Sequence, residues 1–158
     1  MFTILALCTG NAARSIIAEA ILTRDGAGRV RAFSAGSNPV GVVPGATRAC
    51  LAARGLPVAG LRSKGWAEFS GPGAPRLDLV LTLCPVTAAE RHPPWPGRPA
   101  EAFWPLDEPL AAPQDAQAMA FALAYHQLSA RINAALALPL ERLDRDELAA
   151  RLAAIGRG

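Results

Sequence analysis

The sequence lacks several features that would place it in other classes of protein. Its first residues show no basic start followed by a long apolar stretch and a small-residue cleavage site. No apolar run approaches the roughly 20 residues that a transmembrane helix needs. We therefore expect a soluble cytoplasmic protein with no membrane partner. The 158 residues fit one domain with a single sizeable core.

Cysteine is scarce, and neither sign of charge is in large excess. Three cysteines, an odd number in a chain without an export signal, argue for free thiols rather than a disulfide framework. The net charge is only +3, and the arginines form no basic stripe with interleaved aromatics, so no nucleic-acid partner is expected. Neither His92 nor His126 has cysteine or acidic neighbours at metal-ligand spacing, so no metal site is expected.

Short apolar runs alternate with helical patterns along the chain. The predicted strands are Phe2–Leu7, Val30–Ser34, Leu77–Leu83 and a weaker Ala100–Phe103, and the predicted helices are Ala13–Leu22, Pro44–Arg54 and Gln114–Leu136. Such alternation predicts an α/β fold, a three-layer sandwich with a mostly parallel four-stranded sheet between helices. Ligands of such sheets bind beyond the carboxyl ends of the strands.

The last part of the chain carries a helix-start signal. Asp144 and Glu147 form a capping-box-like pair ahead of apolar residues at helical spacing. We expect residues 1–137 to form the main domain and residues 138–158 a C-terminal helical extension, which packs on the domain or on a partner. The protein is expected to be a monomer or a weak dimer. The proline-rich segment Pro85–Pro99 predicts an irregular loop or lid, with His92 as a solvated side chain on it.

The segment Cys8-Thr-Gly-Asn-Ala-Ala-Arg-Ser15 joins the first predicted strand to the first predicted helix. Unpaired N–H groups at a helix N-terminus bind anions, and an arginine such as Arg14 forms a two-pronged ion pair with a tetrahedral oxyanion. The same field favours a thiolate at Cys8, which we predict to be a nucleophile. The alternative for Cys8 is a small core residue at a strand end. The predicted oxyanion-binding residues are Thr9, Gly10, Asn11, Ala12, Ala13, Arg14 and Ser15.

This loop resembles the Cys-x-Gly-Asn-x-x-Arg-Ser loop of the low-molecular-weight protein tyrosine phosphatase superfamily. Within the superfamily, the chain is more similar to the thiol-dependent arsenate reductases. The supporting segments are Phe33–Ser37, Gly55–Pro57, Leu61–Lys64, Leu77–Cys84, Trp95–Gly97 and Trp104–Pro109. The resemblance implies the phosphotyrosine protein phosphatase I type of fold for residues 1–137. It also implies arsenate as the substrate, phosphate as a competitor and no bound cofactor.

The resemblance gives Cys84 a redox role. In the three-cysteine reductases, a cysteine at this position attacks the sulfur of the nucleophilic cysteine and expels arsenite. The alternative is a buried cysteine without chemical consequence, which is also what we expect of Cys50. Members with an internal relay have a further cysteine ahead of a proline, where this sequence has His92. A Cys8–Cys84 disulfide would then be reduced directly, or an external thiol (glutathione, mycothiol or a thioredoxin or glutaredoxin system) would resolve the Cys8 adduct.

A carboxylic acid is also needed, because the oxygen that leaves as Cys8 attacks has to be protonated. The family's acid immediately precedes a proline, which makes Glu108 the positional match. Asp107 keeps the usual residue type one place earlier, and we favour it on that ground. For both residues the alternative is an exposed loop carboxylate.

Three functions remain open on this evidence. The leading one is thiol-dependent reduction of arsenate, as in arsenical resistance. The second is a phosphatase, in which water hydrolyses a Cys8 thiophosphate. Leu110 weakens that reading, because the family commonly has tyrosine there, and Tyr125 lies in a distant predicted helix. The third is a non-catalytic oxyanion-binding domain.

Overall fold

The computed structural model describes residues 1–158. Its four parallel strands form one sheet in the order β2-β1-β3-β4. The strands are β1 (Phe2–Cys8), β2 (Val30–Gly36), β3 (Leu79–Thr82) and β4 (Ala100–Phe103). The α-helices are α1 (Arg14–Asp25), α2 (Gly45–Ala53), α3 (Pro85–Ala89), α4 (Gln114–Leu136) and α5 (Arg145–Arg157), and the 3-10 helices are η1 (Trp66–Phe69) and η2 (Pro109–Ala111). The predicted α/β fold with a parallel four-stranded sheet is confirmed.

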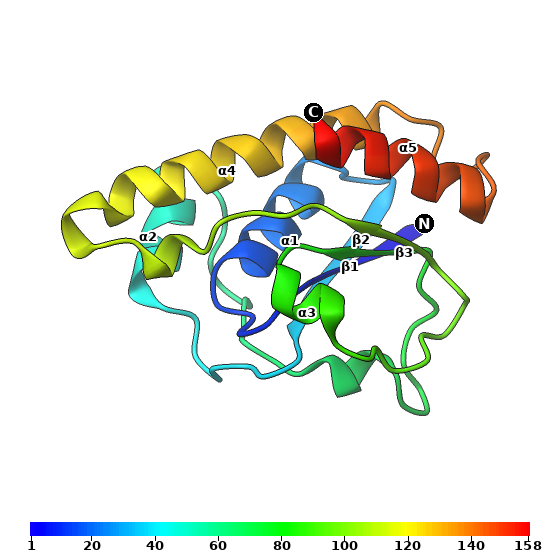
Figure 1. The fold of residues 1–158 in the computed structure, drawn as a ribbon, viewed down its shortest axis with the longest axis horizontal. Coiled ribbons are helices and arrows are strands. Elements are labelled where there is room, and N and C mark those ends of the chain that lie inside the picture. Colours follow the sequence, from blue (N-terminus) through cyan, green and yellow to red (C-terminus); the bar gives the residue numbers. More distant parts are fainter.

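Two hydrophobic clusters of different size cover the two faces of the sheet. The larger contains 30 buried residues from the sheet and from α1, α2, α4 and α5, which lie together on one side (Figure 1). The smaller contains six buried residues, and it is completed by Phe33, Trp66 and Trp95. The second face is therefore closed by η1 and loops rather than by long helices.

The segment Pro85–Pro99 differs from its prediction, because its first five residues form the short helix α3. Proline is tolerated in the first turn of a helix, where its missing N–H would have no partner. Cys84 caps that turn by accepting a hydrogen bond from the backbone N–H of Thr87 at 3.4 Å. The prediction of irregular structure was wrong for this turn, because it counted prolines without their positions.

The final helix begins as its capping pair predicts. The Asp144 carboxylate accepts a hydrogen bond from the backbone N–H of Glu147 at 2.8 Å, and Leu148 and Leu152 are buried. Trp104, fully buried after β4, donates its indole N–H to the Leu152 carbonyl at 2.8 Å. Helix α5 therefore packs into the same core as β4 and α4.

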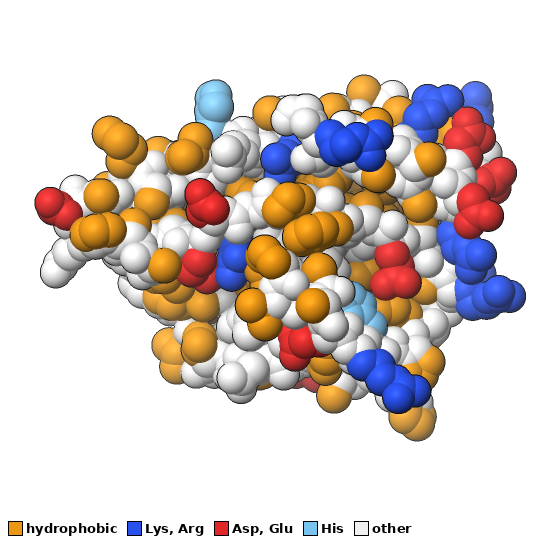
Figure 2. All heavy atoms as spheres, in the orientation of Figure 1, with side chains coloured by type: hydrophobic (Ala, Val, Ile, Leu, Met, Phe, Trp, Pro, Cys, Tyr) orange, Lys and Arg blue, Asp and Glu red, His pale blue; other side chains and the backbone are white.

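Two surface properties bear on the expected partners. No helix combines the length and the apolar character needed to cross a membrane. Figure 2 shows acidic and basic side chains interspersed at the end of the molecule where α5 begins, with no continuous basic stripe on the face in view.

Candidate active site

The loop between β1 and α1 leaves its backbone N–H groups free and engages backbone carbonyl groups. The backbone N–H groups of residues 9–13 donate no hydrogen bond within the protein. The carbonyl groups of the same loop are engaged: Thr9 accepts from the N–H of Asn38, and Gly10 from the N–H of Val40. A run of free N–H groups beside a helix N-terminus is a binding site for an anion. Asn11 adopts a positive φ of 46°, a conformation that asparagine tolerates better than most residues.

Gly36, at the end of β2, lets the neighbouring chain approach this loop closely. A Cβ atom at this position would overlap the Thr9 carbonyl oxygen and would lie 2.9 Å from the Asn11 nitrogen. Only glycine therefore fits beside the loop. The Gly36 N–H also donates to the Lys64 carbonyl at 3.0 Å, which ties a third segment of the chain to the site.

A buried chain of hydrogen bonds leads from the Cys8 sulfur into the core. The Asn11 amide donates to Ser15 Oγ at 2.8 Å and to Ser34 Oγ at 3.0 Å. Its oxygen accepts from the Lys64 backbone N–H at 2.9 Å, which fixes the orientation of the amide. Because Ser15 Oγ accepts from Asn11, its own hydrogen is free to point at Cys8 Sγ, 2.9 Å away. Ser15 therefore donates to the sulfur.

The series of hydrogen bonds that begins at Cys8 ends at an ion pair between Glu19 and Lys64. Ser34 Oγ donates to Glu19 at 2.5 Å, and the same Glu19 oxygen lies 3.5 Å from Lys64 Nζ. Burial lowers the pKa of Lys64, and the adjacent Glu19 carboxylate opposes that shift. The exposed fractions of the two side chains are 7% for Lys64 and 18% for Glu19. A shielded ion pair thus anchors the hydrogen bonds that hold the loop.

Arg14, the first residue of α1, is buried with two of its nitrogens engaged. One terminal nitrogen donates to the Leu106 carbonyl at 3.1 Å, and the other lies 3.2 Å from a Glu108 carboxylate oxygen. Its Nε is buried and makes no hydrogen bond. This arrangement holds the guanidinium at the loop and leaves three of its five N–H donors, the buried Nε–H among them, for a ligand.

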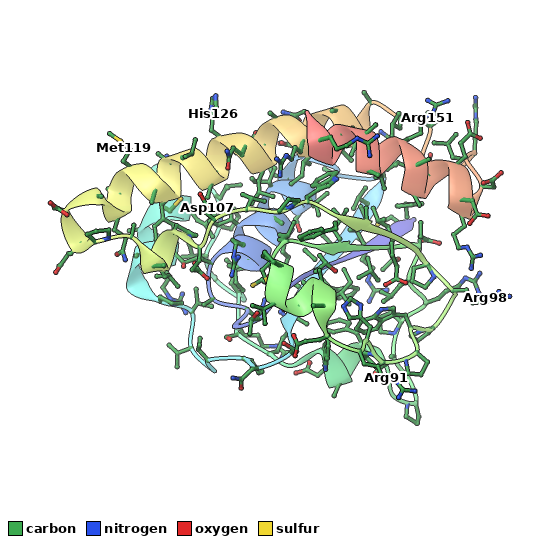
Figure 3. The ribbon with its side chains drawn as sticks, viewed as in Figure 1. Arg91, Arg98, Asp107, Met119, His126 and Arg151 are labelled. Carbon is green, nitrogen blue, oxygen red and sulfur yellow. The ribbon has the colours of Figure 1, made fainter.

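The two candidate acids lie in different surroundings. Glu108 contacts Arg14 with one oxygen and accepts from the Leu110 N–H at 3.1 Å with the other. Asp107, labelled in Figure 3, is exposed and makes no hydrogen bond or ion pair, although it and Glu108 both line a hollow beside α4. Only Glu108 therefore contacts a side chain of the Cys8 loop.

Cys84 lies beside the loop although it is 75 residues beyond it in sequence. The β1–β3 register pairs Leu7 with Thr82, so its continuation brings Cys84 opposite Thr9. The Cys84 sulfur is 3.1 Å from Thr9 Oγ1 and 3.1 Å from Thr87 Oγ1, and it accepts from the Thr87 N–H. Burial raises the pKa of Cys84, but these hydrogen bonds and the charge of Arg14 outweigh burial and bring the pKa below its ordinary value.

Two other sequence predictions have different outcomes. Cys50 is buried in α2, as expected of a packed core thiol, and burial raises its pKa while Arg54 lowers it. His92 was expected to be solvated, and this is wrong: its side chain is only 16% exposed. The ring packs against Trp66 and Trp95 and hydrogen-bonds to the Thr87 carbonyl.

Comparison of the sequence with known protein families gives one match. The low molecular weight phosphotyrosine protein phosphatase family matches residues 3–147. The chain belongs to this family. No curated protein sequence matches the chain.

Solved structures of the low molecular weight phosphatase fold include both reductases and phosphatases. An arsenate reductase in the phosphate-binding state superposes with a TM-score of 0.70 at 23% identity, over 87% of this chain and 98% of that one. A thioredoxin-dependent arsenate reductase of Corynebacterium glutamicum gives 0.62 at 22%, over 84% of this chain and 59% of that one. The tyrosine phosphatase Wzb from Escherichia coli K30, in complex with sulphate, gives 0.64 at 24%, over 83% and 96%. These similarities support the fold. They do not distinguish a reductase from a phosphatase, which depends on the residues of the site.

Four polar residues of the site were not predicted from the sequence. Glu19, Ser34 and Lys64 support the loop, and Thr87 contacts Cys84 and Thr9. Ser34 and Lys64 lie in segments that carried the family resemblance, but nothing local gives either of them a partner. No group of three or more His, Cys, Asp or Glu side chains is arranged to hold a metal ion.

Proposed function

We propose that this member of the family reduces arsenate to arsenite, with thiols as the source of electrons. The observation that carries the proposal is the second thiol at the site. Cys84 hydrogen-bonds to the residue that follows the nucleophile, and its surroundings favour the thiolate although it is buried. A phosphatase completes its reaction with water and has no use for such a group.

The first step forms a bond between sulfur and arsenic. The free N–H groups of residues 9–13 and Arg14 bind the arsenate oxygens. The Cys8 thiolate attacks arsenic, and one As–O bond breaks, its oxygen leaving as water. The proton comes from a carboxylic acid, and such assistance is typically worth about 10²- to 10⁴-fold. Of the two candidates, Glu108 is favoured because it contacts Arg14, the residue that binds the anion.

The second step transfers two electrons. The Cys84 thiolate attacks the Cys8 sulfur, so that an S–S bond forms and the S–As bond breaks. The electron pair of that bond stays on arsenic, which changes from the +5 to the +3 state and leaves as arsenite. By the β1–β3 register Cys84 lies opposite Thr9, one residue along from Cys8, and the disulfide requires the Cys8 and Cys84 Cα atoms to come within about 7 Å of each other. Two equivalents of an external thiol, from glutathione, mycothiol or a thioredoxin-type protein, then reduce the disulfide.

The phosphatase alternative shares the loop and the first step. A phosphatase acting on tyrosine also needs aromatic walls to hold the phenyl ring of its substrate. Leu110 stands where the family commonly has a tyrosine, and Tyr125 packs under the Arg54 guanidinium, 4.7 Å from ring centre to Cζ. This absence of an aromatic wall next to Pro109 supports the reductase.

A single-turnover experiment tests the proposal. Purified, fully reduced protein is mixed with arsenate without added thiol, and the released arsenite and the oxidation state of each cysteine are measured. We expect wild type to release arsenite and to form a Cys8–Cys84 disulfide, and Cys84→Ser to lose both. Cys50→Ser is the matched control, since it removes a buried thiol outside the site, and it should behave as wild type.

Three other results would contradict the proposal in different ways. Release that requires glutathione and is unaffected by Cys84→Ser would mean a one-cysteine reductase. Hydrolysis of phosphate esters without arsenite release under any condition would favour the phosphatase. A wild type with neither activity, together with a Cys8→Ser protein that still binds arsenate, would favour a non-catalytic oxyanion-binding domain.

A further inference from the structure

The short helix α3, which carries Cys84 at its N-cap, is fastened at its other end by His92. The His92 Nε2 atom lies 2.8 Å from the Thr87 carbonyl oxygen. Because a carbonyl can only accept, Nε2 carries the hydrogen of this bond. The same carbonyl accepts from the Glu90 N–H at 3.2 Å. A helix of five residues is unstable on its own, so these bonds hold the turn in place.

The surroundings of the His92 ring allow it one orientation. Its centroid lies 5.3 Å from that of Trp66 and 6.0 Å from that of Trp95, both in edge-on contacts. The two tryptophan rings also meet each other edge-on at 6.0 Å. The second ring nitrogen of His92, Nδ1, lies 3.4 Å from a Glu101 oxygen on β4. The imidazole therefore lies packed between the two tryptophans, bonded to α3 and close to β4.

Thr87 connects His92 to the thiol. Its carbonyl accepts from His92, while its N–H and its hydroxyl both contact the Cys84 sulfur. Its hydroxyl also lies 3.0 Å from that of Thr9 in the nucleophile loop. A rotation of Thr87 away from His92 would therefore withdraw two hydrogen bonds from Cys84.

We propose that His92 is a positioning residue for the resolving thiol: through the Thr87 carbonyl it holds α3 in the arrangement that directs Thr87 at Cys84. This inference rests on the proposed function, because it assigns Cys84 the second step. His92 itself contacts neither Cys8 nor Arg14, so we expect its main effect on that step. The nucleophile loop keeps its own support from Asn11 and Lys64.

Two substitutions of His92 separate its hydrogen bond from its packing. His92→Phe keeps a ring between the tryptophans and removes the donor, whereas His92→Gln supplies an amide donor in its place. His126→Phe is the control, since it changes the only other histidine, which points away from the body of the molecule on α4 (Figure 3). Thermal unfolding of each variant verifies that it is folded.

The first measurement follows the alkylation of Cys84 by iodoacetamide as a function of pH, with mass spectrometry of the labelled peptide. We expect His92→Phe to move the Cys84 profile to higher pH and to lower its rate at neutral pH about three- to tenfold, the ratio that corresponds to one ordinary hydrogen bond. His92→Gln should restore most of the rate, and the Cys8 profile should not move. An unmoved Cys84 profile in His92→Phe, or equal losses at Cys8 and Cys84, would overturn the inference.

The second measurement is formation of the Cys8–Cys84 disulfide in a single turnover with arsenate. It should slow in His92→Phe by the same three- to tenfold, recover in His92→Gln and stay unchanged in His126→Phe. An unslowed rate would overturn the inference. If wild type forms no disulfide, the proposed function fails, and the alkylation profiles still decide whether His92 positions Cys84.

Discussion

Cys84 and Cys50 are both buried thiols without a disulfide, and their surroundings act on them in opposite directions. Around Cys50, burial dominates and raises the pKa, although Arg54 opposes it. Around Cys84, burial acts in the same sense, but hydrogen bonds from Thr87 and Thr9 together with the charge of Arg14 reverse the result. Burial therefore does not make a thiol inert when polar groups are aimed at it.

The adjacent acids Asp107 and Glu108 also differ in their surroundings, although neither of them is buried. Asp107 is exposed and makes no hydrogen bond or ion pair, whereas Glu108, the next residue, pairs with Arg14. The two cysteines are the same residue type, and the two acids are similar types. In each pair it is the neighbouring groups that differ. Substitutions of those neighbours, or of the residues themselves, should therefore affect the two members of each pair differently.

The largest effect is expected at the carboxylates. Glu108→Gln keeps one of the two oxygens, which can accept from either the Leu110 N–H or Arg14, and it cannot donate a proton as an acid. We expect the rate of arsenite release in a single turnover to fall by about 10²-fold or more. Asp107→Asn is the matched change one residue away, and it should leave the rate close to that of wild type. The reverse result would make Asp107 the acid, as its residue type suggests.

A smaller effect is expected when Cys84 loses part of its polar surroundings. Thr87→Val keeps the shape of a fully buried side chain and removes the hydroxyl that contacts Cys84 and Thr9. The pKa of Cys84 should rise toward the behaviour of Cys50, and its alkylation at neutral pH should slow about three- to tenfold. Cys50 in the same sample is the internal control. Parallel changes at both cysteines would mean that the variant loosened the core instead.

These contrasts explain what could be predicted from the sequence and what could not. The Cys8 loop could be predicted because strand, loop and helix start are continuous in the chain, and Arg14 is only six residues from Cys8. Four strands, four helices and the Asp144 cap were predictable for the same local reason. The short helix α3 was missed because its prolines were counted without their positions and because its capping group is a cysteine, which is not a common N-cap residue.

The partners of the site residues could not be predicted, because they come from distant parts of the chain. Cys84 meets Thr9 across 75 residues, and Arg14 meets Glu108 across 94. The one available signal for the loop's support was composition: Lys64 is the only lysine in a chain rich in arginine. The lysine ammonium is a compact point charge, unlike the guanidinium of the surrounding arginines, but the sequence does not reveal that Glu19 is its partner.

The smallest expected effect is on stability, and its sign differs between the two thiols. The pKa of Cys84 is lowered in the folded protein, so the unfolded chain binds more protons between the folded and unfolded pKa values. Cys84 therefore adds stability above its unfolded pKa, and this contribution is lost as the pH falls through the folded pKa. The pKa of Cys50 is raised, so its contribution is present below the unfolded pKa and is lost as the pH rises through the folded pKa.

Urea unfolding of wild type, Cys84→Ser and Cys50→Ser in the presence of a reductant measures these contributions. The series should run from about pH 6 to about pH 10, a range that spans the ordinary cysteine pKa. The free energy of unfolding of wild type minus that of Cys84→Ser should increase with pH, and the difference for Cys50→Ser should decrease. If both differences decreased with pH, burial would govern both thiols, and the hydrogen bonds of Thr9 and Thr87 would not stabilise a Cys84 thiolate.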